Sequence, residues 1–291
     1  MSDTAVAPGG EALRTIEVSN VAPPPGRLHS LDVFRGVTIA AMLLVNNPGS
    51  WDAVYPPLLH AAWHGWTPTD LIFPFFLFIV GVAMTFSFGK LLARGESRPL
   101  LFRKSAKRAA ILFGLGLLLH SYPWIGYDYG GLRIPGVLQR IALAYLVSAL
   151  IATRASIRTQ IIVTAVLLIG YWLVMTVLPV PGTNGTPGAM LLDRPETTMA
   201  AYWDRVLFDW RRFGLGNHLW SGSVTWDPEG FLSTSGAICT ALLGNLTGRW
   251  IGQPKPLVER VAGMFAVGTL GMMVGSMWHW VFPINKGLWT G

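Results

Sequence analysis

The segment TDLIFPFFLFIVGVAMTFSFG, residues 69–89, determines the class of protein to which this chain belongs. No charged residue follows Asp70 until Lys90, and the run is long enough to cross the roughly 30 Å apolar core of a bilayer as one helix. Six more runs have the composition expected of membrane spans, at residues 31–47, 106–121, 134–153, 160–178, 230–247 and 260–281. The pattern predicts an all-α, polytopic transmembrane helix bundle with about seven spans.

The composition of the whole chain agrees with this class. The chain has 291 residues, of which 52% are hydrophobic and only 13% are charged, and its mean hydropathy is +0.45. In soluble domains about a quarter of the residues are charged. The 13 Trp and 33 Gly residues suit interfacial belts and close helix packing, respectively. We therefore expect an integral membrane protein.

The formal net charge of +7 could indicate a nucleic-acid partner, but the basic residues cluster at the ends of the apolar runs and not along one amphipathic face. That placement is the positive-inside pattern of membrane proteins, so we expect no nucleic-acid partner. Residues 1–26 are rich in Pro, Gly and Ala and have no apolar stretch that would indicate a signal peptide. We expect them to form a disordered cytoplasmic tail before a membrane domain at 27–291.

The basic residues also predict the orientation of the spans. When the chain is threaded through the seven spans, fifteen of the 22 Lys and Arg residues fall on the side of the N-terminus. The N-terminus is then cytoplasmic, and the predicted location is the inner membrane, crossed many times. Residues 48–68 and the long loop 179–229 lie on the extracytoplasmic side, and a loop of that length is usually functional.

Two histidines lie at the outer end of the second span. His60 and His64 are four residues apart, and Asp70 follows where the apolar run begins. A zinc site needs three or four ligands and no further pair lies nearby, so we expect no metal. A structural hydrogen bond and a general base remain open for His60. The Pro-Gly that follows the first span explains one of the two adjacent asparagines as a helix cap but does not readily explain Asn46 inside the apolar run, whose amide could donate a hydrogen bond to a developing oxyanion.

Charged side chains at the other ends of spans are also candidates. Asp32 and Arg35 are three residues apart and could form an ion pair or a basic lip that receives an anionic ligand. Arg140 lies just within the fourth predicted span, where a charge must face a cavity or a partner. Asp32, Asp70 and a ligand phosphate are the candidate partners for Arg140.

Six motifs in this order resemble the heparan-alpha-glucosaminide N-acetyltransferase family, a group of multi-span acetyltransferases. They cover the chain from about residue 27 to its end and read RLHSLDVFRG, VNNPG, HAAWHGWTPTDLIFPFFLFIVG, RIPGVLQRIALAY, DPEG and FPINKGLW. The resemblance implies transfer of acetyl from cytoplasmic acetyl-CoA to an amino sugar or glycan on the other side of the membrane. We therefore expect an acetyl-CoA-dependent transmembrane acyltransferase.

The resemblance also implies roles for individual residues. The family's catalytic histidine matches His60, and its asparagine matches Asn46 or Asn47. Apart from the resemblance, Asp70 is a candidate for orienting the imidazole or for pairing with an arginine. His64 matches a position where the family does not require histidine. The cytoplasmic basic cluster and the span-end arginines are the candidates for the phosphates of acetyl-CoA, namely Arg35, Arg103, Arg108 and Arg140.

Several alternatives stay open at this point. The family's chains continue beyond the motif that matches FPINKGLW, so one expectation is a bundle truncated at its C-terminus. The large lumenal domain of the animal enzymes is absent from this sequence, and the acceptor sugar is not specified. A transporter or flippase for a glycolipid or anionic sugar and a scaffold of an envelope complex are the competing functions, and a homodimer is a candidate assembly. Binding sites at span ends and not at the midplane favour the enzyme.

Overall fold

The computed structural model describes residues 28–290, and in that range it contains helices and loops but no β-strand. The all-α class is therefore confirmed for the described part of the chain, whereas the predicted tail at 1–26 lies outside it. Seven helices have 18 residues or more, and a shorter helix, α6 (Met199–Phe208), lies in the long loop. The long helices are α1 (His29–Asn46), α2 (Ile72–Ala93), α3 (Arg98–His120), α4 (Val137–Arg154), α5 (Ile157–Thr176), α7 (Thr234–Ile251) and α8 (Leu257–Trp278). Single-turn 3-10 helices occupy Pro56–Leu58, Pro68–Leu71, Tyr129–Gly131, Gly188–Leu191, Pro195–Thr197 and Arg211–Phe213.

Each predicted span corresponds to one long helix, but some boundaries differ. Helix α3 begins at Arg98 and not at residue 106, because Pro99 lies in its first turn, where its missing N–H costs nothing. Helix α7 begins at Thr234 and not at residue 230, because the preceding residues form turns. Four helical segments are long and apolar enough to cross a membrane, at Pro68–Ala93, Val137–Arg154, Ile157–Thr176 and Leu257–Trp278.

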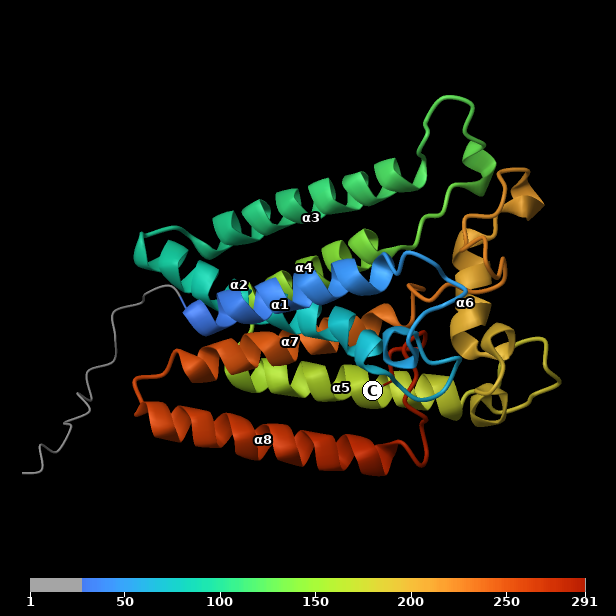
Figure 1. The fold of residues 1–291 in the computed structure, drawn as a ribbon. Coiled ribbons are helices and arrows are strands. Elements are labelled where there is room, and N and C mark those ends of the chain that lie inside the picture. Colours follow the sequence, from blue (N-terminus) through green and yellow to red (C-terminus); the bar gives the residue numbers. More distant parts are fainter. Residues whose placement is uncertain (1–27, 291) are drawn as a thin grey trace, which may run out of the picture.

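The long helices run alternately up and down, so the bundle has two ends with different connections (Figure 1). At one end the connections are short, at 94–97, 155–156 and 252–256. We call this the short-loop end. At the other end the connections are long, at 47–71, 121–136, 177–233 and 279–290, and α6 lies beside the ends of the long helices (Figure 1). We call this the long-loop end.

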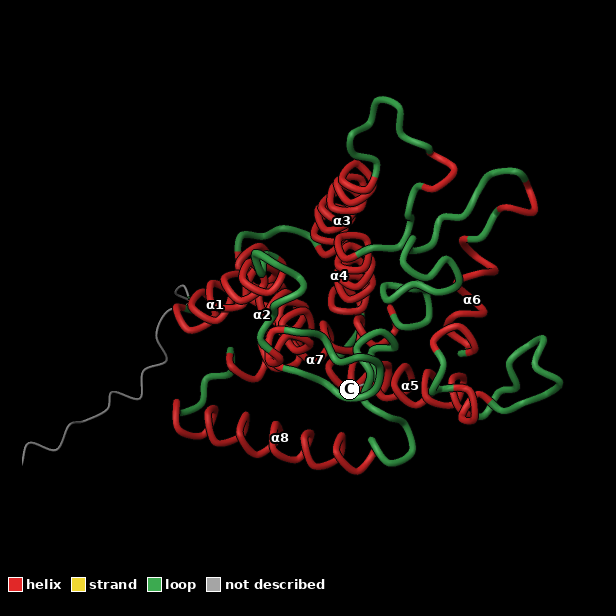
Figure 2. Tube along the Cα trace, turned by 45° about the vertical axis from the view of Figure 1, so that its right-hand side comes forward, coloured by secondary structure: helices red, strands yellow, loops and turns green. Residues whose placement is uncertain are grey.

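Helices α2 and α7 form the centre of the bundle. They approach so closely that a Cβ atom added at Gly81 would lie 2.0 Å from the Ala241 carbonyl oxygen, and one at Gly244 would lie 2.1 Å from that of Phe78. Small residues at such a crossing let two backbones pack directly, as in many membrane bundles. Helix α8 differs, because none of its residues is buried, and both views place it at the outside of the bundle (Figures 1 and 2).

Candidate active site

His60 and Asp70 form a hydrogen-bonded pair at the long-loop end. The Nδ1 atom of His60 lies 2.7 Å from Oδ1 of Asp70. The other carboxylate oxygen accepts hydrogen bonds from the backbone N–H groups of Ala61 at 3.0 Å and Thr67 at 2.9 Å. Because a carboxylate only accepts, Nδ1 carries the hydrogen and Nε2 keeps a free lone pair for chemistry. The Asp70 side chain is only 3% exposed whereas that of His60 is 49% exposed, so a fixed carboxylate orients an accessible imidazole.

Lys286 lies against the same imidazole. Its Nζ atom is 2.9 Å from Nε2 and 3.0 Å from Nδ1 of His60. Burial lowers the pKa of the Lys286 ammonium below its ordinary value, against the carboxylates of Glu229 and Asp70, which raise it. The sequence analysis assigned no role to Lys286. The signal that could have identified it is its position as the single charged residue of the motif FPINKGLW.

The segment that carries Lys286 is fixed by its neighbours. The Gly65 N–H donates to the Ile284 carbonyl at 2.7 Å, which joins this segment to the loop of His60. Asn285 is 1% exposed, and its side-chain oxygen accepts from the Leu288 N–H at 2.9 Å. Trp289 is 7% exposed, and its ring N–H donates to the Thr240 hydroxyl of α7. Lys286 therefore projects from a rigid turn and not from a loose loop.

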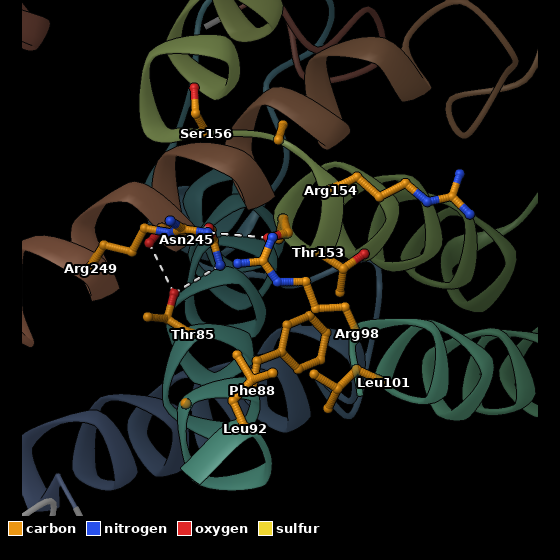
Figure 3. A pocket seen from close by; sticks show the side chains of 13 residues that line it. Thr85, Phe88, Leu92, Arg98, Leu101, Thr153, Arg154, Ser156, Asn245 and Arg249 are labelled. Carbon is orange, nitrogen blue, oxygen red and sulfur yellow. Dashed lines mark hydrogen bonds between the residues drawn. The ribbon is translucent and has the colours of Figure 1, made fainter. Parts of the chain in front are cut away.

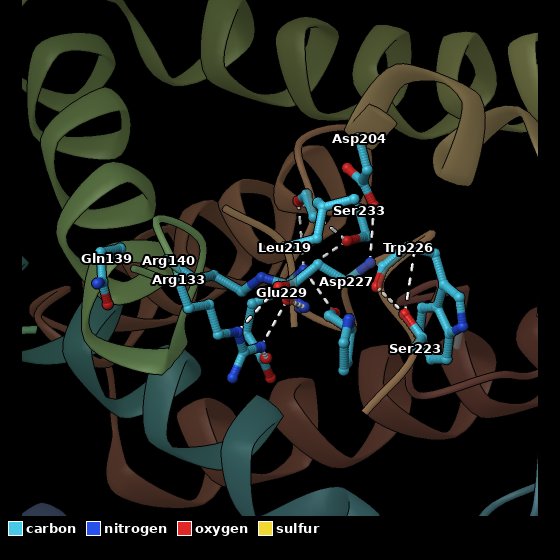
Figure 4. Close-up of polar contacts among 12 residues, drawn as sticks. Arg133, Gln139, Arg140, Asp204, Leu219, Ser223, Trp226, Asp227, Glu229 and Ser233 are labelled. Carbon is cyan, nitrogen blue, oxygen red and sulfur yellow. Dashed lines mark hydrogen bonds and ion pairs between the residues drawn. The ribbon is translucent and has the colours of Figure 1, made fainter. Parts of the chain in front are cut away.

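A second group of charges lies next to this site, and we call it the Arg133 cluster: Arg133, Arg140, Asp204, Asp227 and Glu229 (Figure 4). The Arg133 guanidinium forms two hydrogen bonds to Asp227, at 2.8 and 2.5 Å, and another to Glu229. Such a bidentate geometry fixes both partners. The two carboxylates raise the pKa of Arg133, although burial, the largest single effect, lowers it.

Arg140 takes its partners from the turn before α7. Its guanidinium donates to the Pro228 carbonyl at 2.8 Å and to the Ser233 hydroxyl, and it lies 5.1 Å from the centre of the Trp289 ring. The side chain is 2% exposed. The structure thus pairs Arg140 with this turn and not with Asp32 or Asp70, and its role in binding the donor stays a prediction.

Asp204 of α6 holds the same turn from the other side. Its two carboxylate oxygens accept from the N–H groups of Asp227 at 3.1 Å and Phe231 at 2.9 Å. Gly230 is required here, because a Cβ atom would lie 2.2 Å from the Asp204 carboxylate. Burial raises the pKa of Asp204 to about 7, although the two N–H donors act in the opposite direction.

The remaining candidates of this end have hydrogen-bond partners other than His60. The Asn46 amide donates to the Met42 carbonyl of its own helix at 2.9 Å, and its side chain is exposed. His64 pairs with Asp193 at 3.1 Å. Within residues 28–290 no group of three or more His, Cys, Asp and Glu side chains is arranged to hold a metal ion.

The short-loop end contains a cavity of about 550 Å³ between α2, α3, α4, α7 and the connection at 155–156 (Figure 3). Three arginines line it, Arg98, Arg154 and Arg249, none of which the sequence analysis singled out. Their shared signal is a position in the first or last turns of a helix. Of the predicted donor-binding residues, Arg103 and Arg108 are exposed on α3, and Arg35 lies 3.6 Å from Asp32.

These features define a helical membrane protein that carries an imidazole–carboxylate pair at one end of its bundle and an arginine-lined cavity at the other. The family model for the catalytic region of heparan-alpha-glucosaminide N-acetyltransferase matches residues 27–192, and the chain belongs to this family. It is 30% identical to heparan-alpha-glucosaminide N-acetyltransferase of Homo sapiens and 31% identical to that of Mus musculus, over 91% of this chain. The aligned region covers 46% of either relative, so the chain spans less than half the length of these proteins.

Proposed function

We propose that this chain is a membrane-embedded acetyltransferase that moves acetyl from cytoplasmic acetyl-CoA to an amino sugar or glycan on the extracytoplasmic side. The observation that carries the proposal is the His60–Asp70 pair, at 2.7 Å, in a member of this family. Asp70 holds the hydrogen on Nδ1, and this leaves Nε2 able to take a proton from the acceptor.

The two ends of the bundle suit the two substrates. The positive-inside pattern predicts that the short-loop end is cytoplasmic, because the basic connections gather there. The cavity at that end offers Arg98, Arg154 and Arg249 to the phosphates of acetyl-CoA, and guanidinium groups bind phosphate through paired hydrogen bonds. The exposed Arg103, in the first half of α3, and Arg108, near the middle of that helix, would attract the anionic donor. The acceptor would reach His60 at the long-loop end.

The chemistry needs one base and one site for negative charge. The amino group of the acceptor attacks the carbonyl carbon of the thioester, and the carbonyl oxygen takes up the electron pair. His60 accepts the proton of the amine at Nε2. When the carbonyl re-forms, the carbon–sulfur bond breaks, and the CoA thiolate takes a proton from the imidazolium. In a route through an acetyl-imidazole, Nε2 attacks the same carbon first and the CoA thiolate leaves. The amine then attacks the acetyl-imidazole, Nε2 leaves as neutral imidazole, and the proton lost by the amine neutralises the thiolate. One of the two N–H donors of the Asn46 amide is used by the Met42 carbonyl, and the other is the candidate donor to the oxyanion.

Purified protein in detergent tests the proposal with radiolabelled acetyl-CoA and glucosamine. We expect acetylglucosamine to form, and His60→Ala to reduce turnover by at least about 10²-fold, the usual contribution of a general base. His64→Ala is the matched control, because His64 lies four residues away and pairs with the exposed Asp193. Turnover that survives in His60→Ala would rule out His60 as the general base. Sugar uptake into proteoliposomes without turnover would favour the transporter.

A further inference from the structure

Lys286 and His60 are brought together from loops 226 residues apart in the sequence. Nδ1 of the imidazole donates to Asp70, which leaves a lone pair on Nε2. The Lys286 Nζ atom lies 2.9 Å from Nε2 and 3.0 Å from Nδ1, so the ammonium sits over the ring and not on the in-plane lone pair of Nε2. A cation is therefore next to the atom that is to act as base, and that atom keeps its lone pair.

The surroundings of Lys286 fix the position of this cation. The charged groups that act on it are the carboxylates of Glu229 and Asp70 and the guanidinium of Arg140. The two carboxylates favour the charged ammonium, and the half-buried position makes its electrostatic effect on a nearby ligand larger than it would be in open water. Because the turn at 284–290 is held by buried side chains, little reorganisation is needed to present this charge.

The ammonium and the lone pair of Nε2 can act in the same step. Because Nζ lies over the ring, Nε2 can take up a proton or attack a carbonyl carbon while Lys286 stays in place. In both routes the ammonium N–H groups lie about 3 Å from Nε2 when the reacting carbonyl oxygen becomes negative.

We propose that Lys286 is a further catalytic residue, whose ammonium group stabilises the negative charge on the acetyl carbonyl oxygen as it reacts beside Nε2 of His60. This inference rests on the proposed acetyl transfer for the identity of the donor. The oxyanion forms between the ammonium and the imidazole, and it loses its charge when the carbonyl re-forms and the thiolate leaves. Lys286 donates hydrogen bonds throughout and needs to transfer no proton.

The test uses p-nitrophenyl acetate, a small activated ester that requires neither the CoA site nor the sugar site. The measured quantity is the His60-dependent release of p-nitrophenolate, which is the rate of the full chain minus that of His60→Ala. We expect Lys286→Met to lower this rate by about 10²-fold, the usual cost of removing an oxyanion donor, and Lys286→Arg to retain most of it. Lys255→Met is the control, because Lys255 pairs with Glu259 at the exposed short-loop end.

Two outcomes would overturn the inference. An unchanged or faster rate in Lys286→Met would mean that Lys286 only covers the imidazole, and a wild-type chain with no His60-dependent release would remove the basis for any role. The proposed function fails in a different way, if wild type releases p-nitrophenolate through His60 but transfers no acetyl from acetyl-CoA to glucosamine. In that transfer assay we expect Lys286→Met to lower kcat with little change in KM for acetyl-CoA.

A second measurement decides the matter if Lys286→Met does not fold. Because burial lowers the pKa of Lys286, the ammonium is lost at a lower pH than in an ordinary lysine. The His60-dependent rate of wild type then falls as the pH rises through this value. Arginine stays charged over the whole range, so Lys286→Arg should keep its rate at alkaline pH. Identical alkaline limbs in the two proteins would contradict the inference.

Discussion

The two ends of the bundle use charged residues in opposite ways. At the short-loop end, Lys104 and Glu96 form an ion pair at 2.5 Å with side chains 45% and 22% exposed. At the long-loop end, Arg133 and Asp227 also approach to 2.5 Å, but their side chains are 21% and 0% exposed. Two ion pairs with the same distance therefore have different interaction energies, because water screens the exposed pair and not the buried one.

This difference separates two tasks. Arg98 and Arg154 at the cavity are exposed and can exchange water for the phosphates of a ligand, whereas Arg249 is half-buried and already donates to Asn245 and Ala152. Buried, mutually hydrogen-bonded charges cannot leave their partners, but they hold neighbouring groups in position. The His60–Asp70–Lys286 arrangement lies at the second kind of end, where a reaction benefits from charges that are already oriented.

Arg133→Met should produce the largest effect, because it removes the partner of two carboxylates. Asp227, whose side chain is 0% exposed, would lose its guanidinium partner. Breaking a buried pair in this way typically costs about 3–5 kcal/mol. We expect a large drop in the apparent melting temperature in detergent and loss of His60-dependent activity. A variant that melts like wild type would show that the Arg133 cluster does not hold this end together.

Arg249→Met tests the short-loop end through binding and not through stability. The Arg249 guanidinium lines the cavity and donates to the Ala152 carbonyl at 3.2 Å. Loss of one charge-assisted hydrogen bond to a phosphate typically costs about 1.5–3 kcal/mol. We expect the Kd for CoA, measured by calorimetry, to rise about 10- to 100-fold. Arg158→Met, exposed at the same end but outside the cavity lining, should bind CoA like wild type; equal losses in both would mean that the cavity is not the donor site.

Asp204 should give the long-loop end a pH-dependent stability. Its pKa is raised from the ordinary 3.8 to about 7 in the folded protein, so between these values the folded state binds more protons than the unfolded state. Stability from this group therefore falls as the pH rises from about 4 to about 7 and is level above that. We expect wild type to melt at a higher temperature at pH 5 than at pH 8, by at least about 3 °C.

Asp204→Asn is the comparison for this effect. An asparagine does not titrate, so the difference in melting temperature between pH 5 and pH 8 should shrink, while one of the two backbone N–H groups at Asp227 and Phe231 loses its acceptor. The variant should therefore be less stable at both values. An unchanged difference between the two pH values would assign the pH dependence to another group.

The sequence predicted local features of the fold and site better than distant ones. The apolar runs predicted each long helix, because a helix of membrane length is formed by contiguous residues and is visible in the sequence as one apolar run. His60 and Asp70 are only ten residues apart, so proximity along the chain made their pairing a natural candidate. The pairing of Lys286 with His60 and of Asp227 with Arg133 could not be predicted in this way. Hydrophobic periodicity does not indicate which distant loops come together at one end of a bundle.

Removal of the Lys104–Glu96 ion pair should have the smallest effect on stability. It tests whether the nitrogen–oxygen distance alone predicts how much an ion pair contributes to stability. Lys104→Met removes a pair whose nitrogen–oxygen distance equals that of Arg133 and Asp227. Exposed pairs contribute about 0–1 kcal/mol, because water and salt compete for both charges. We expect a change in melting temperature within about 2 °C and unchanged His60-dependent activity. A loss as large as that of Arg133→Met would contradict the distinction between the two ends, since burial would then not decide how much an ion pair contributes.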